Sequence, residues 1–200
     1  MNNQLGSTFY QSEDVVILAK RLLGKKIVSS VKGIITAGLI VETEAYKAPE
    51  DRASHAYGNR RTHRTSTMFE QGGKAYIYRC YGIHHLFNVV TAPEGVAHAI
   101  LIRAIEPIEN VDTMLSRRKM SKVTPNLTNG PGKWTVAMGI TVDYNGISLI
   151  DKQSPVQIFS YPDITDDKIL ASPRVGVDYA GECALWPWRF RIKDNIWSGK

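Results

Sequence analysis

The chain has 200 residues, of which 43% are apolar, 9% are aromatic and 22% are charged. This length and composition fit one globular domain over residues 1–200 and exclude intrinsic disorder and fibrous repeats. No apolar run approaches the roughly 18 residues of a membrane span, and residues 1–6 have neither the basic nor the apolar region of a signal peptide. We therefore expect a cytoplasmic or nucleoid-associated protein with no membrane partner.

Positive charge gathers in two stretches of the chain. Overall, 25 Lys and Arg side chains stand against 19 Asp and Glu, which gives a formal net charge of +6. Residues 51–80 carry six basic and two acidic side chains, a net of +4, and residues 113–135 carry five basic and no acidic ones, a net of +5. Such clustering is typical of a surface that binds a polyanion, although two solvated basic loops would show the same composition.

The cysteines and glycines argue against two common kinds of site. Cys80 and Cys183 are far apart and lack the CxxC or HxxxH spacing of a structural zinc site. No Gly-rich phosphate loop of the Walker or Rossmann type occurs. We therefore expect two reduced thiols, no metal site and no bound cofactor.

Apolar periodicity predicts a helix near the amino terminus and a β-hairpin after it. Apolar residues recur at helical spacing from Val15 to Leu22, after the sequence Ser12-Glu13-Asp14, which reads as a cap followed by acids. The β-branched residues from Lys26 to Tyr46 are interrupted by a Lys32-Gly33 turn, which indicates a hairpin with a long second strand. A polar loop rich in His and Arg follows over residues 47–67.

The rest of the chain reads as strands with a few short helices. We expect helices at 110–119 and 134–138, a loop at 124–132, and strands at 75–81, 86–91, 97–105, 148–150, 156–161, 174–177 and 189–192. Strands dominate, and no regular βαβ alternation or internal repeat occurs. The sequence therefore predicts an α+β fold, a single domain with a curved, mainly antiparallel β-sheet flanked by helices.

Two carboxylates lie within an otherwise apolar predicted strand, Ile40-Val41-Glu42-Thr43-Glu44-Ala45-Tyr46. Because strand side chains alternate between faces, Glu42, Glu44 and Tyr46 share one face. A carboxylate in a partly apolar cleft is what a general base requires. An edge strand with a solvated outer face would give the same pattern, and the residues alone leave both interpretations open.

A second informative segment is Tyr76-Ile77-Tyr78-Arg79-Cys80-Tyr81-Gly82. Alternation places Tyr76 and Tyr78 on one face, where Tyr76 has the pattern of a packing residue, and Tyr81 on the other. An aromatic residue followed by Gly at a strand end can act as a wedge between stacked bases. Arg103 interrupts the apolar run 99–102, and an isolated cation in such a strand needs water or a partner such as a buried Glu.

These residues together resemble the alkyladenine (3-methyladenine, N-methylpurine) DNA glycosylase family, in its compact single-domain form. The resemblance runs in order over residues 8–197. It rests on the segments Ile40–Tyr46, Pro49–Asp51, Ala53–His55, Met68-Phe69, Tyr76–Tyr78, Tyr81-Gly82, Asn88, Leu101–Pro107, Asn129–Lys133 and Arg174–Val177.

The resemblance implies a monofunctional base-excision repair enzyme. Such an enzyme flips alkylated purines, or hypoxanthine, out of double-stranded DNA and hydrolyses the N-glycosidic bond to leave an abasic site. Glu44 matches the general base that activates a water, Arg103 matches the arginine beside it, and the backbone carbonyl of Val175 matches a third group that positions the water. No lysine occupies a matched catalytic position, so no lyase step is expected.

The resemblance also implies how DNA is held. Tyr46, His55 and Tyr78 match the walls of the pocket for the flipped purine, and Asn88 matches the residue that disfavours guanine. Tyr81 matches the side chain inserted into the vacated gap. We add from the charge distribution that Arg117, Arg118, Lys119 and Lys133 contact the DNA backbone, and we expect a monomer.

Two features depart from the family pattern, and two other functions fit parts of the sequence. His84 lies where some relatives have an aromatic residue beside the wedge, and residues 59–67 differ in detail. A metal-dependent nuclease could use Glu42, Glu44, Asp51 and His55 as a cation site. A non-enzymatic nucleic-acid-binding protein would use the basic stretches and tyrosines alone.

Overall fold

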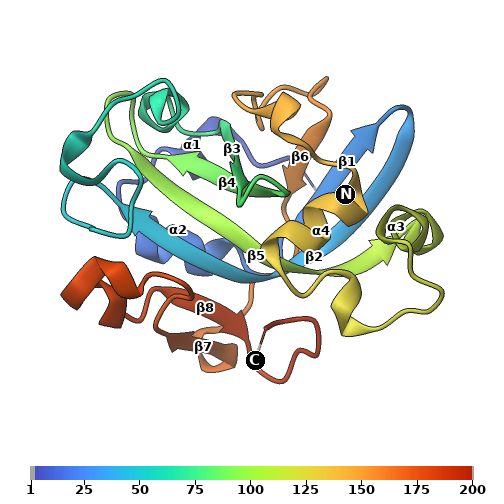
Figure 1. Cartoon of the computed structure of the whole chain (residues 1–200). Coiled ribbons are helices and arrows are strands. Elements are labelled where there is room, and N and C mark those ends of the chain that lie inside the picture. The colour runs from blue at the N-terminus through green and yellow to red at the C-terminus, as the bar shows by residue number, and fades with distance from the viewer. Residues whose placement is uncertain (1–2, 200) are drawn as a thin grey trace.

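A curved antiparallel β-sheet forms the centre of the protein (Figure 1). The computed structural model describes residues 3–199. Six strands pair in the order β3-β4-β5-β2-β1-β6, and β8 adds to β2 and carries β7 on its other side. The strands are β1 (Lys26–Val31), β2 (Ile34–Lys47), β3 (Ala75–Cys80), β4 (His84–Thr91), β5 (His98–Glu109), β6 (Val156–Phe159), β7 (Ile169–Ser172) and β8 (Arg189–Ile192).

The helices are short and pack on this sheet. Helix α2 contacts β2 and β5, α4 contacts β4 and β5, and α3 lies against α4. Their bounds are α1 (Ser7–Tyr10), α2 (Val15–Leu22), α3 (Val111–Arg118) and α4 (Pro131–Met138). Single 3-10 turns or longer 3-10 segments lie at Tyr57–Asn59, Ser66–Phe69, Pro125–Leu127, Val142–Tyr144, Asp166–Lys168 and Asp178–Leu185. The predicted α+β class with a mainly antiparallel sheet is confirmed.

Two predicted helices differ at their starts, and local chemistry explains both differences. Asp14 caps α2, because its Oδ1 accepts a hydrogen bond from the amide of Ile17 at 2.9 Å, so Ser12 is not the cap. Helix α4 begins at Pro131, three residues before the predicted start. Proline is favoured in the first turn of a helix because its missing N–H would have no partner there.

The long strands β2 and β5 pair with irregular register beside the carboxylates. Ile40 lies opposite Ile105, Glu42 opposite Ala104 and Thr43 opposite Ile102, so that Val41 and Arg103 have no direct partner. The other edge of β2 pairs with β1 over its first half and with β8 at residues 42–44. Such bulges bend strands and redirect side chains, often next to active sites. Residues 42–44 are therefore central in the sheet, and the edge-strand interpretation is wrong.

Alternation along β5 separates the hydrophobic core from a pocket. Ile100 and Ile102 belong to the main core, whereas Leu101 and Arg103 line the pocket. Trp134 of α4 is fully buried in the same core and donates its indole N–H to the Ile102 carbonyl at 2.9 Å. This contact ties α4, and the loop that precedes it, to the centre of the sheet.

Two predicted strands are wrong, and one strand was not predicted. Residues 174–177 form a loop, because the side chain of Arg174 is buried against another segment and Gly176 has φ of 73°. Residues 148–150 contribute only an isolated bridge between Ser148 and Lys74. The unpredicted β7 pairs with β8. Among residues 3–199, no helix is long and apolar enough to cross a membrane.

Replacing Trp134 with Phe tests the link between α4 and β5. The variant leaves the Ile102 carbonyl without its donor and removes buried ring atoms. We expect the free energy of unfolding to fall by about 2 to 4 kcal/mol. Urea unfolding followed by circular dichroism measures it. The half-buried Trp186 is the matched control. If Trp186→Phe lowers the free energy of unfolding as much as Trp134→Phe does, Trp134 has no special role in linking α4 to β5.

Candidate active site

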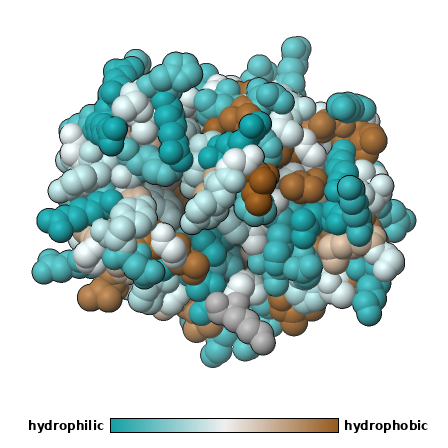
Figure 2. Space-filling view, viewed as in Figure 1, coloured by the Kyte–Doolittle hydropathy of each residue, from teal (hydrophilic) through white to brown (hydrophobic). Residues whose placement is uncertain are grey.

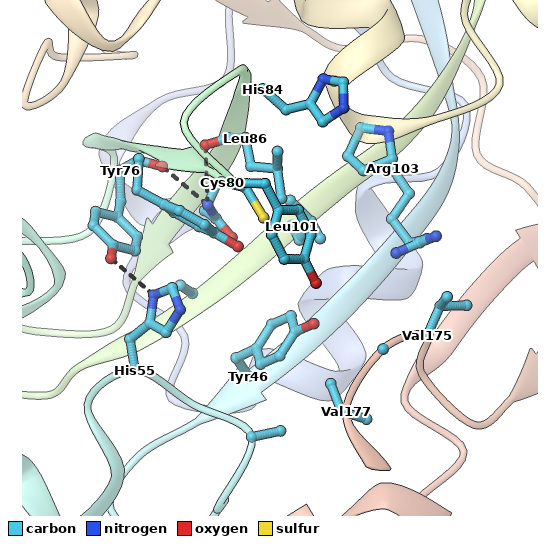
Figure 3. Close-up of a pocket in the computed structure, with 18 of the residues that line it drawn as sticks. Tyr46, His55, Tyr76, Cys80, His84, Leu86, Leu101, Arg103, Val175 and Val177 are labelled. Carbon is cyan, nitrogen blue, oxygen red and sulfur yellow. Dashed lines mark hydrogen bonds between the residues drawn. The ribbon is translucent and has the colours of Figure 1, made fainter. Parts of the chain in front are cut away.

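A cavity of about 500 Å³ opens between the sheet and three loops (Figure 3). Strands β2 to β5 form one side, and residues 53–68, 130–133 and 175–179 close the others. This volume lies in the usual range for small-molecule sites. The polar and aromatic side chains that line it are Tyr46, His55, Arg64, Tyr76, Tyr78, Tyr81, His84, Asn88, Arg103, Lys133 and Tyr179.

Aromatic rings form one wall of the pocket. The ring of Tyr78 lies 5.5 Å from that of Tyr76 and 4.6 Å from that of His55, in an edge-on arrangement with the histidine. The guanidinium of Arg64 covers the Tyr78 ring at 4.8 Å. Tyr76 is therefore a pocket residue as well as the packing residue that its pattern predicted.

His55 is held in the pocket by hydrogen bonds on both ring nitrogens. Its Nδ1 lies 2.9 Å from the Tyr76 hydroxyl, and its Nε2 lies 3.4 Å from Nη2 of Arg64. Because a guanidinium can only donate, this contact assigns the acceptor role to Nε2 and the proton to Nδ1. Burial, assisted by the charge of Arg64, lowers the pKa of His55 to about 4.

Glu44 is fully buried directly behind the pocket wall and accepts hydrogen bonds on both oxygens. The Tyr46 hydroxyl donates to Oε2 at 2.8 Å, and the backbone amide of Val175 donates to Oε1 at 2.8 Å. Nη1 of Arg103 lies 3.3 Å from the same Oε1. Figure 3 shows Tyr46, Arg103 and Val175 around one end of the pocket. The structure thus brings together the predicted catalytic group.

Glu42 has the same strand face as Glu44 and different partners. Its Oε1 accepts from Nε of Arg103 at 2.8 Å and from Nε of Arg189 at 2.7 Å. Its Oε2 accepts from the amide of Gly199 at 2.6 Å. Arg103 therefore bridges two carboxylates, as its isolated position in an apolar strand suggested.

A second buried ion pair supports the pocket from the other side of Tyr46. Arg174 makes a bidentate pair with Asp51, with Nη2 2.8 Å from Oδ1, and also donates to the Ala45 carbonyl at 2.8 Å. Its guanidinium lies 4.8 Å from the Tyr46 ring centre. Because the carboxylates of Asp51 and Glu42 are paired with arginines, they are not arranged as ligands of the cation site in the nuclease alternative.

Tyr81 lies at the tip of the turn between β3 and β4. Tyr81 and Gly82 both have positive φ, 50° and 74°, and the amide of Ile83 donates to the Cys80 carbonyl at 3.2 Å. Two successive positive φ values are those of a tight hairpin turn that points its side chains outward. The Tyr81 side chain is 91% exposed and borders the pocket.

Asn88 and His84 occupy defined positions in the pocket lining. Asn88 is buried and donates its amide N–H groups to the carbonyls of Tyr76 at 3.0 Å and Leu86 at 3.4 Å. These bonds hold the amide group in one orientation. His84 packs on the first turn of α4, where a side chain on Gly132 would lie within 2.8 Å of its ring.

The four predicted backbone-binding residues have different surroundings. Arg117 donates to the Ala137 carbonyl at 3.2 Å, near the end of α4, and Arg118 donates to the Asn126 carbonyl at 3.3 Å. Lys119 is an exposed residue that ends α3. Lys133 borders the pocket, with Nζ 2.9 Å from Oδ1 of Asn129. Figure 2 shows that hydrophilic side chains cover much of the viewed face and that several hydrophobic groups lie among them.

Reasoning from the sequence missed the contacts of two arginines of the site. Arg64 was counted only as one of the basic residues in 51–80, although it contacts both His55 and Tyr78. Arg174 was named in a family motif but assigned to a strand, and its ion pair with Asp51 was not predicted. The only signal for Arg64 was its position in the basic loop between the segments Ile40–Tyr46 and Tyr76–Gly82, and nothing local distinguished it from its neighbours.

The lowered pKa of His55 has a measurable consequence for stability. An unfolded His with a pKa near 6.5 takes up a proton before the folded one, whose pKa is about 4. Stability is therefore expected to fall as the pH decreases from 6.5 to 4, and this part of the dependence should disappear in His55→Gln. Nitrogen-detected NMR should show a neutral ring at pH 5.5. Replacing Arg64 with Gln should raise the pH at which the His55 ring is half protonated, because it removes a nearby positive charge. A wild-type His55 that is half protonated near pH 6.5 would contradict the lowered pKa.

Comparison with known proteins identifies the family of this chain. The family described as methylpurine-DNA glycosylase matches residues 8–196. Proteins named "Putative 3-methyladenine DNA glycosylase" are similar over nearly their full length. The one from Chlamydia pneumoniae is 48% identical and covers 96% of both chains, and the one from Bacillus mycoides is 45% identical and covers 98% of this chain and 100% of its own. The chain belongs to the methylpurine-DNA glycosylase family.

Proposed function

We propose that this protein is a DNA glycosylase that releases alkylated purines such as 3-methyladenine from double-stranded DNA by hydrolysis. The observation that carries the proposal is the buried Glu44, which lies behind the wall of the aromatic pocket and is held by three residues that line it, Tyr46, Arg103 and Val175. The family and its relatives support the reaction class. The lesion range, with hypoxanthine as one candidate, is part of the proposal.

The aromatic wall suits a purine that has left the helix. A base inside a duplex cannot reach a pocket, so it has to be flipped out, and unstacking costs least for a damaged base. Tyr46, Tyr78 and His55 would then surround it. Alkylation makes some purines cationic, and a cation over a Tyr face gains about 0.5 to 2 kcal/mol. The neutral His55 adds no repelling charge. Asn88 would disfavour guanine, because the 2-amino group of that base would meet the Asn88 side chain.

The chemical step would use Glu44 as a general base. A water oxygen attacks the deoxyribose C1′, the N-glycosidic bond breaks with its electron pair leaving on the base, and the water proton passes to Glu44. The sugar is oxocarbenium-like in the transition state, so a nearby carboxylate also stabilises its charge. The Val175 amide already bonds Glu44, and the carbonyl of the same residue would orient the water.

DNA binding would place the hairpin tip in the helix and basic residues along the backbone. Tyr81 is exposed at the pocket edge and would fill the gap that the flipped nucleotide leaves. Lys133 at the pocket edge, with Arg118 and Lys119, would contact phosphates. Arg117 would have to leave its contact with the Ala137 carbonyl, or support α4 instead. We also propose that the protein acts as a monomer.

Replacing Glu44 with Gln tests the proposed function. We expect excision of 3-methyladenine from a duplex oligonucleotide to fall by about 10² to 10⁴, because the general base is lost, while damaged-DNA binding remains. Single-turnover release of free base measures it. The control is Glu50→Gln, which removes a partly exposed carboxylate that pairs with Lys47.

Three outcomes of this assay would contradict the proposal. A wild-type excision rate in Glu44→Gln would show that Glu44 takes no part in the chemical step. Strand cleavage that a chelator abolishes, without release of free base, would favour the nuclease. Binding with no base release on any lesion in a panel of alkylated and deaminated purines would favour a binding protein without enzymatic activity.

Replacing Tyr81 with Ala tests the proposed wedge. Without a side chain in the gap, the flipped state is less stable, so excision from a duplex should fall more than excision from a substrate whose target base is unpaired. A fluorescent base analogue next to the lesion reports flipping. Tyr57→Ala, at an exposed tyrosine outside this pocket, is the control. Equal losses on both substrates would leave Tyr81 without a wedge role.

A further inference from the structure

Glu42 is a buried carboxylate to which the proposed chemistry gives no role. It is 1% exposed and does not line the pocket. Three donors from different segments converge on it, namely Arg103 of β5, Arg189 of β8 and the backbone amide of Gly199. A carboxylate is costly to bury, so a site with so many specific donors needs an explanation.

The contact with Arg103 determines where that guanidinium points. Its Nε is bound to Glu42 at 2.8 Å, and its Nη1 lies 3.3 Å from Glu44. Because the guanidinium is planar and rigid, a fixed Nε leaves Nη1 little freedom. Arg103 also lies at the irregularity between β2 and β5, where regular strand pairing does not constrain it.

The charges around Glu42 also indicate that it holds Arg103. Burial alone would raise the pKa of Glu42, but the charges of Arg103 and Arg189 and the amide of Gly199 lower it below its usual value. Glu42 therefore carries its negative charge at neutral pH. It balances the buried cation Arg189 and the partly buried cation Arg103, which faces Glu44.

The carboxyl-terminal segment closes the back of this cluster. The Gly199 amide lies 2.6 Å from Oε2 of Glu42, and Nη1 of Arg191 donates to the Gly199 carbonyl at 2.7 Å. A side chain on Gly199 would lie 3.0 Å from both Nη2 of Arg189 and Oε2 of Glu42, which is closer than packing normally allows. Glycine therefore permits the backbone to approach the carboxylate.

We propose that Glu42 is a positioning residue that acts through Arg103, and that the Gly199 amide completes its binding site. Glu42 holds Arg103 so that Nη1 meets Oε1 of Glu44 and keeps the general base in one orientation. The inference rests on the proposed glycosylase function and assigns to that site a residue outside the pocket.

The first test compares two carboxylates that both contact the carboxyl-terminal segment. In Glu42→Gln, we expect the single-turnover rate of 3-methyladenine release to fall by about 10²-fold, since small misplacements of catalytic groups have effects of this size. Affinity for a duplex that contains an abasic-site analogue should stay the same. In Glu106→Gln, which loses a contact with Asn195 and none with Arg103, the rate should be unchanged.

A double-mutant cycle separates positioning from general destabilisation. If Glu42 acts through Arg103, Glu42→Gln should add less than about threefold to the loss already caused by Arg103→Ala. If Glu42→Gln lowers the excision rate of the Arg103→Ala variant by the same factor as it lowers that of the wild type, the proposal is overturned. So would a wild-type rate in Glu42→Gln.

A third variant keeps the test decisive if Glu42→Gln does not fold. Gly199→Pro removes the amide donor without changing any charge, but it also adds a side chain beside Arg189 and Glu42. Gly199→Ala adds the same Cβ and keeps the amide, so it is the matched control, and thermal unfolding identifies which variants are folded. We expect Gly199→Pro to lose about 5- to 10-fold more excision rate than Gly199→Ala, which is the effect of one hydrogen bond of ordinary net strength. An unchanged rate would overturn the proposal. Absence of base release by the wild-type protein would instead reject the glycosylase function itself.

Discussion

The bridge that Arg103 makes between Glu42 and Glu44 is the interaction on which the rest of the site depends. Buried charges are stable only when close partners replace the water they have lost. Here the partners come from β5, β8, the loop at Val175 and the segment at Gly199, all of which meet on β2. The addition of β8 to β2 at residues 42–44 brings Arg189 and the carboxyl-terminal segment to Glu42.

Tyr46 connects this cluster to the pocket. Its hydroxyl is bound by Glu44, and its ring lies on the guanidinium of Arg174, which Asp51 neutralises. A wall residue held at both ends needs little reordering when a ligand arrives, which is the benefit of preorganisation. Tyr81, by contrast, is almost fully exposed at a hairpin tip. The site therefore combines a rigid pocket with a projecting aromatic side chain.

Much of the fold could be predicted from local patterns. The helix at 15–22, the hairpin from Lys26 and the central strands were predicted because apolar residues recur with periods of 3.6 and 2 that depend only on backbone geometry. The shared face of Glu42, Glu44 and Tyr46 follows from the same alternation. The family motifs further identified Glu44, Arg103 and Val175, which the structure brings into contact.

Only the tertiary structure decided which partner each of these side chains has. The two carboxylates of β2 look alike in sequence, yet Glu42 pairs with arginines and with Gly199, 157 positions away, while Glu44 meets the pocket wall. The segment at Arg174 was predicted as a strand because its apolar pattern allowed it, but an ion pair with Asp51, 123 positions away, holds it as a loop. The periodicity of apolar residues along the sequence indicates which face of a helix or strand is buried. Ion pairs between residues far apart in the chain have no such local pattern, because they depend on how the whole chain folds.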